Sequence, residues 1–203
     1  MKNIRWGALA TALGAAVVSS GAIAESTYGY NAAGTGSVTA TARVNLQVTV
    51  AKLILLRVGS TNAAVDTLAW TVGKSIPAVP TTPATGNNTA VDWSGAAPTT
   101  PALANPAAVN VFAWTNATTP TINCAVGAWT GPAGGPTNAN FTVAVGGATP
   151  VPHPGANLGA CASTNFTANT LLTGTWTYAL GGTPGTWPAG VYSTTVTYTA
   201  TGL

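Results

Sequence analysis

Apolar and polar residues alternate with a period of two along much of this chain. The clearest example is the segment 37–50, in which every second residue is apolar and the residues between are polar. Successive side chains of a β-strand point to opposite faces, so we expect one long strand here, with an apolar face and a face in water. The apolar face comprises Val38, Ala40, Ala42, Val44, Leu46, Val48 and Val50.

Further strands are predicted by the same pattern, each bounded by residues typical of turns. The continuous apolar run 53–58 is typical of a strand buried on both faces, although a short core helix fits it as well. Alternation returns at 65–72, 108–115, 121–129, 139–145, 170–180 and 190–201.

The alternation stops between residues 76 and 107, where the chain is rich in Pro, Ala and Thr. Proline cannot donate to a β-ladder, so a long surface excursion is expected. About eight short strands, separated by Gly/Pro/Asn turns and without a convincing helix, are typical of an antiparallel β-sandwich of the Ig-like or jelly-roll type. Residues 25–203 are therefore expected to form one all-β domain.

The first 24 residues have the features of an export signal. Lys2 and Arg5 form a short basic region, residues 6–18 are apolar and rich in Ala, and residues 22–24 fit a small-residue cleavage site. No later apolar run is long enough to span a bilayer. We expect a bacterial exported chain that begins near Glu25 and reaches the periplasm, the cell surface or the medium.

Two cysteines, Cys124 and Cys161, are present. Export exposes them to an oxidising environment, and no cation lies near either of them in the sequence to lower a thiol pKa. A structural disulfide between them is therefore expected.

Charge is confined to the first half of the chain, since no Asp, Glu, Lys or Arg occurs from Trp93 to Leu203. Without the signal, the chain has four basic and three acidic residues, which gives a net charge of +1. A nucleic-acid binder needs a clustered basic surface, so nucleic acid is excluded as a partner. Enzymes need groups that move protons or stabilise charge, so this composition argues against catalysis. The 36 Thr residues suggest a surface solvated by hydroxyls and suited to self-association.

His153 is the only histidine and lies between Pro152 and Pro154, which is typical of an exposed loop. A zinc site needs three or four ligands, and one histidine with two paired cysteines falls short of that. We therefore expect no catalytic residue, no metal site and no cofactor.

Six tryptophans follow the signal. Those on alternating strands are expected in the core: Trp70, Trp114 and Trp176. Those beside Gly/Pro-rich loops are candidates for exposed aromatics: Trp93, Trp129 and Trp187. Exposed aromatic rings stack on sugars or anchor protein interfaces, and the sequence leaves both open.

The segment 188–199, PAGVYSTTVTYT, resembles the final strand of exported bacterial β-sandwich proteins, namely spore-coat-U-like and chaperone–usher-type pilin subunits. In them a Pro/Ala-Gly-x-Tyr turn introduces a Thr/Val strand. The resemblance implies a surface or fimbria-like subunit. The cysteines lie elsewhere than in the usual pilin arrangement, and no functional residue is carried over.

These observations lead to the hypothesis of an exported, non-enzymatic structural protein that associates with itself. The apolar residues Val38, Val44, Leu46, Val48 and Val50 either enter a neighbouring copy by β-strand addition or form the first strand of their own sandwich. The alternative function is a carbohydrate-binding or adhesin module that recognises surface glycans through Trp93, Trp129 or Trp187.

Overall fold

The computed structural model describes residues 25–61, 64–79 and 81–203 of the chain. The expected export signal, residues 1–24, lies outside the described residues. The chain divides into two compact units, Met1–Val50 and Ala51–Leu203, which are treated separately below. Every strand within the described residues belongs to the second unit.

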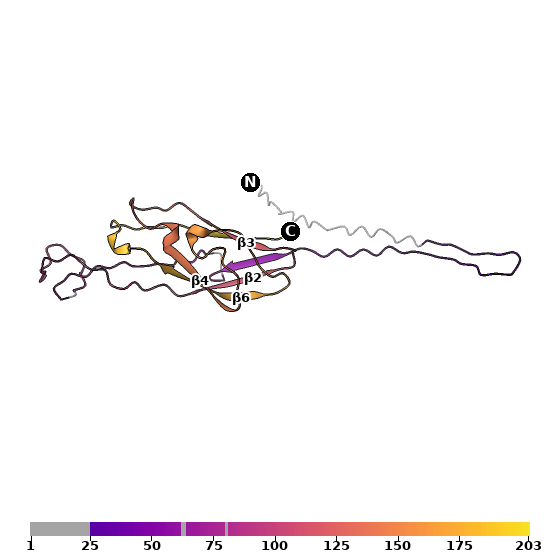
Figure 1. Ribbon diagram of the computed structural model, residues 1–203, viewed down its shortest axis with the longest axis horizontal. Helices are drawn as coiled ribbons and strands as arrows, with labels where there is room; N and C mark the ends of the chain where they lie inside the picture. Colours follow the sequence, from indigo (N-terminus) through magenta and orange to yellow (C-terminus); the bar gives the residue numbers. More distant parts are fainter. Residues whose placement is uncertain (1–24, 62–63, 80) are drawn as a thin grey trace, which may run out of the picture. The chain divides into compact units, whose positions relative to one another are not determined.

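The described residues form seven strands in two antiparallel sheets, which confirms the expected all-β sandwich with one strand fewer than predicted. Figure 1 shows how these strands are arranged. The first sheet has the order β1 (Ile54–Val58), β2 (Val109–Thr115), β6 (Leu172–Leu180), β4 (Phe141–Thr149). The second sheet has the order β5 (Thr164–Asn165), β3 (Thr121–Val126), β7 (Val196–Thr201). Three short 3₁₀ turns complete the elements: η1 (Asn138–Asn140), η2 (Leu158–Ala160) and η3 (Pro184–Thr186).

The core lies between the two sheets, and buried residues alternate with less buried ones along its strands. On β2, Val109, Val111 and Ala113 are buried, whereas the residues between them are not. Trp176 of β6 is fully buried, and its indole Nε1 donates to the carbonyl oxygen of Val151 at 2.9 Å. This hydrogen bond satisfies the one polar atom that the buried indole carries.

One predicted strand is more exposed than expected, and another is absent. The run 53–58 does contain β1, but β1 is an edge strand and Leu55 is 54% exposed, so it is not buried on both faces. Residues 65–72 carry no strand. Their apolar residues still turn inward: Trp70 is half-buried and meets Phe141 edge-on at 5.4 Å.

The long excursion at 76–107 is present between β1 and β2. Its described residues contain no strand, and only isolated bridges occur there, such as those from Ser75 to Thr99 and from Ile76 to Thr81. Just before the excursion, the ammonium group of Lys74 donates a hydrogen bond to the carbonyl oxygen of Gly185.

Trp114 is not a core residue, contrary to the prediction. It lies on β2 with the opposite parity to Val111, so it points to the outer face of the first sheet, opposite Leu55 of β1. Nearby on the same face, the guanidinium of Arg57 lies 3.9 Å from the centre of the Phe112 ring. The sequence alternates aromatic and aliphatic residues here, and the aliphatic ones are buried.

The expected disulfide between Cys124 and Cys161 is confirmed, with Cα atoms 5.3 Å apart. It joins β3 to the loop that follows η2. Because 37 residues separate the two cysteines, the bond removes much of the conformational freedom of the unfolded chain.

Candidate functional site

The first unit supplies residues 25–50, which we call the arm. No strand is assigned to it, so the prediction that 37–50 is the first strand of the chain's own sandwich is not met. Its apolar face is open to solvent. The exposed fractions of its larger side chains are 55% for Val38, 62% for Val44, 89% for Leu46, 86% for Val48 and 76% for Val50.

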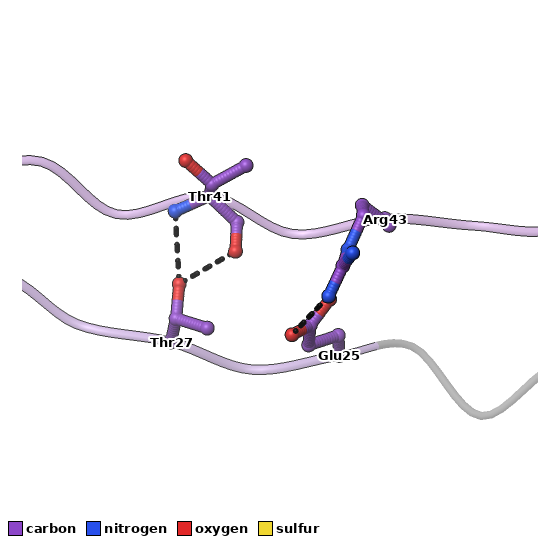
Figure 2. Close-up of polar contacts among 4 residues, drawn as sticks. All are labelled: Glu25, Thr27, Thr41 and Arg43. Carbon is purple, nitrogen blue, oxygen red and sulfur yellow. Dashed lines mark hydrogen bonds and ion pairs between the residues drawn. The ribbon is translucent and has the colours of Figure 1, made fainter.

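Part of the arm folds back on itself as a hairpin (Figures 1 and 2). Glu25 forms an ion pair with Arg43, with Oε2 and Nε 2.9 Å apart. Two residues further in, the hydroxyl of Thr27 accepts from the backbone N–H of Thr41 at 2.9 Å and donates to its carbonyl oxygen at 2.8 Å. These opposed pairs have the stepwise register of an antiparallel hairpin.

A turn at residues 31–36 closes this hairpin. The backbone N–H of Gly34 donates to the carbonyl oxygen of Asn31 at 3.2 Å, and the Asn31 side chain accepts from Ala33. Gly34 and Gly36 have φ angles of 66° and 81°, in the left-handed region that glycine adopts without strain. The sequence Asn-Ala-Ala-Gly-Thr-Gly is therefore suited to the reversal.

The second unit presents an open sheet edge at β7. In the β3–β7 ladder, the N–H of Gly127 donates to the carbonyl of Thr195, so odd-numbered residues of β7 direct their backbone groups towards β3. The backbone groups of Val196, Tyr198 and Ala200 therefore point away from the sheet. Within the described part of residues 51–203, no backbone group pairs with them.

Strand β1 presents a similar open edge. The N–H of Gly59 donates to Asn110, and the carbonyl of Leu53 accepts from Asn116, so odd-numbered residues of this strand face β2. The even-numbered residues direct their backbone groups outward: Ile54, Leu56 and Val58. Although β1 and β7 belong to different sheets, they lie next to one another.

Side chains along these two edges are only partly covered. Ile54, Leu56, Val196, Tyr198 and Ala200 pack against the core but remain half-buried. The opposite edge of the first sheet is different, because residues 156–157 bridge to β4 there. The side of the sandwich formed by β1 and β7 is therefore both unpaired and incompletely filled. We call it the open edge.

His153 is buried, with 9% of its surface exposed, so its prediction as an exposed loop residue is wrong. Its Nδ1 lies 2.6 Å from the carbonyl oxygen of Gly155, and its Nε2 lies 2.8 Å from the hydroxyl of Tyr198. The Tyr198 hydroxyl lies 2.7 Å from that of Tyr178. The ring also meets Trp176 edge-on at 4.8 Å.

The direction of each hydrogen bond in this network follows from the Gly155 carbonyl oxygen, which can only accept. A carbonyl oxygen only accepts, so Nδ1 carries the proton and donates to Gly155, and in the neutral ring Nε2 accepts from Tyr198. Tyr178 then donates to Tyr198. Burial lowers the pKa of His153, opposed by the hydrogen bond to Gly155, and burial raises the pKa values of both tyrosines. All three groups are thus held neutral, as a structural network under β7.

The three candidate surface tryptophans are not gathered into one site. Trp93 is 58% exposed, and its Nε1 donates to Ala96 at 2.7 Å. Trp129 is half-buried, stacks on Phe141 at 5.1 Å and donates to Asn138. Trp187 is half-buried beside Tyr192.

Tyr192 and Trp129 line a shallow depression of about 360 Å³ with the loop 130–137. Tyr192 itself occupies much of the loop's concave side, because a methyl group on Gly135 would lie 2.1 Å from its ring. The Tyr192 hydroxyl donates to Pro188 at 2.5 Å. The loop therefore packs closely around the ring of Tyr192.

Within the described ranges, no three His, Cys, Asp or Glu side chains are grouped to hold a metal ion. Nor does any helix among those residues have the length and apolarity to cross a membrane. Comparison with protein-family models, curated proteins and solved structures gave no match to this chain.

The sequence pattern identified the arm but not the open edge or the buried network. The open edge follows from which strands become neighbours, and this depends on the whole topology. One signal for the network was present: Tyr178 and Tyr198 lie at inward positions of their strands, and a buried tyrosine hydroxyl needs a partner.

Proposed function

We propose that this chain is an exported, non-enzymatic structural subunit that assembles with copies of itself by β-strand addition. The arm of one copy inserts along the open edge of the next copy, between β1 and β7. The observation that carries the proposal is that one chain has both an exposed, alternating apolar segment and a partly filled sheet edge.

The two surfaces are chemically complementary. The edge offers outward backbone groups on both strands, and an added strand donates to and accepts from these groups. Fully burying a Val or Leu side chain is worth about 1.5–3 kcal/mol, and Leu46, Val48 and Val50 each lose most of their exposed surface on insertion. The inserted side chains in turn cover Leu56 and Tyr198.

The geometry of this interaction favours a linear assembly. The donor is the arm and the acceptor is a different surface, so the contact is heterologous and each added copy presents a new arm or a new edge. Such contacts form filaments when the rotation between copies does not close a ring. A net charge near zero opposes this association little. The resemblance of residues 188–199 to pilin subunits is in keeping with the proposal.

Deletion of residues 25–50 tests the proposal. All seven strands lie outside this segment, so we expect the shortened chain to fold and to remain monomeric in size-exclusion chromatography. The chain with its arm is expected to form filaments visible by electron microscopy. Loss of folding in the shortened chain would show that the segment belongs to its own sandwich instead.

A matched pair of substitutions refines this test. Leu46→Asp places a carboxylate on the apolar face of the arm, and we expect it to abolish assembly because a charge would be buried unpaired. Thr49→Asp places the same charge on the polar face, which stays in water, and is expected to assemble normally. Equal behaviour of the two variants would contradict insertion of the apolar face.

Glycan binding is a second candidate function, favoured by the exposure of Trp93 in a surface rich in Thr and Asn. An exposed indole can stack on a sugar ring. Titration of the chain with a glycan panel, followed by tryptophan fluorescence, tests it. Trp93→Ala is expected to remove any response, and a response unchanged by Trp93→Ala would exclude this site.

A further inference from the structure

We infer that the arm has two parts with separate tasks, an inference that rests on the strand addition proposed above. Residues 44–50 are the part that enters a second copy of the chain. The hairpin of residues 25–43 stays outside the acceptor and fixes the position at which the inserted strand begins.

Hydrogen bonding within the hairpin supports this division. A strand added at the open edge must present free N–H and C=O groups to the acceptor. At Thr41, both groups are already bonded to the hydroxyl of Thr27, at 2.9 and 2.8 Å. Insertion of this part of the arm would first have to break those bonds. Residues 44–50 lie beyond the hairpin and carry no such partner among the described residues.

The ion pair marks the boundary between the two parts. Arg43 donates to both carboxylate oxygens of Glu25, from Nε at 2.9 Å and from Nη2 at 3.1 Å (Figure 2). The pair is exposed and contributes little to stability in water. Moving it into an apolar sheet edge would instead remove the hydration of two charges, at a cost of several kcal/mol per ion. Insertion is therefore expected to stop at Val44.

Side-chain size and segment length agree with this boundary. The apolar positions from 44 to 50 carry Val, Leu, Val and Val, whereas positions 40 and 42 carry Ala, which fills less of a groove. The inserted part is seven residues long, close to the six residues of β7 and the five of β1. The part that fills the acceptor best is also the part that the hairpin leaves free.

Gly29 makes a direct test of the hairpin possible. It faces Thr39 so closely that a methyl group on Gly29 would lie 2.8 Å from the Thr39 carbonyl oxygen. Gly29→Ala is therefore expected to open the hairpin. Gly73→Ala is the matched control, because a methyl group at Gly73 meets nothing within 4 Å.

The experiment is hydrogen exchange followed by mass spectrometry, comparing assembled chains with the monomeric Leu46→Asp variant. We expect amide exchange at residues 44–50 to slow by about tenfold or more on assembly, since ordered strand hydrogen bonds protect amides. Exchange at residues 37–42 should not change. In the Gly29→Ala chain, protection should spread into 37–42, whereas Gly73→Ala should match the unaltered chain.

The outcomes separate this inference from the proposed function. Protection of the whole segment 38–50 in the unaltered chain would overturn the two-part division but leave strand addition standing. An unchanged protection pattern in Gly29→Ala would overturn the role of the hairpin. Failure to assemble, or assembly without protection anywhere in the arm, would overturn both the inference and the proposed function.

Discussion

The buried network around His153 makes a sharp prediction about stability. His153→Phe keeps a ring of similar size but removes both hydrogen bonds, so the Gly155 carbonyl loses its donor and the Tyr198 hydroxyl loses its acceptor. A buried polar group left without a partner costs about 1–3 kcal/mol. Because Gly155 is only half-buried, we expect a total loss of about 2–4 kcal/mol. In a chain of this size the Tm should fall by about 5–15 °C.

The same network predicts how stability depends on pH. Burial lowers the native pKa of His153 below the 6.5 of an exposed histidine, so below pH 6.5 the unfolded chain binds a proton that the native chain does not. The stabilisation is complete above pH 6.5 and is lost as the pH falls towards the native pKa. The loss is at most about 1.4 kcal/mol per pH unit. His153 is the only histidine of the chain, so its replacement isolates the imidazole contribution to this pH dependence.

Thermal unfolding followed by circular dichroism at pH 7.0, 6.0 and 5.0 measures both effects. The Tm of the unaltered chain should fall across this series, whereas that of His153→Phe should be lower at pH 7.0 and nearly constant. Tyr192→Phe is the control, because it removes a hydroxyl whose hydrogen bond to Pro188 is exposed. The reasoning is refuted if His153→Phe unfolds at the same temperature as the unaltered chain, or shows the same dependence on pH.

Two other predictions concern stability. Replacing Cys124 and Cys161 together by alanine should destabilise the chain by about 4 kcal/mol on the chain-entropy model for a 37-residue separation; chemical denaturation measures this, and an unchanged midpoint would contradict it. Gly135→Ala should lower the Tm because the added methyl group overlaps the ring of Tyr192, whereas Gly73→Ala should not; equal melting temperatures would show that the loop adapts freely.

Local alternation of residues predicted the strands of the sandwich and part of its interior. Trp176 is buried as predicted, and every second residue of β2 is buried, because the period of two is a property of the strand itself. The same reasoning placed Trp114 in the core, since parity alone does not say which face of a strand is covered. On β2 the smaller aliphatic residues face the second sheet, and the aromatic ones face outward.

Long-range features were not predictable in this way. The burial of His153 depends on two tyrosines from β6 and β7, which lie 25 and 45 residues further along the chain. The edge position of β1 depends on which strand pairs with β2, and the open edge depends on where β7 ends the second sheet. The arm was recognisable from its sequence, but its exposure on both faces follows from its absence from either sheet.

The most direct test of strand addition is to separate donor from acceptor. A chain of residues 51–203 is titrated with a synthetic peptide of residues 37–50, and binding is measured by calorimetry. We predict one peptide bound per chain, and binding at least about 30-fold weaker for a peptide carrying Leu46→Asp, which corresponds to about 2 kcal/mol. Absence of binding by the unaltered peptide, in a chain that is folded and whose full-length form assembles, would contradict insertion of the arm at the open edge.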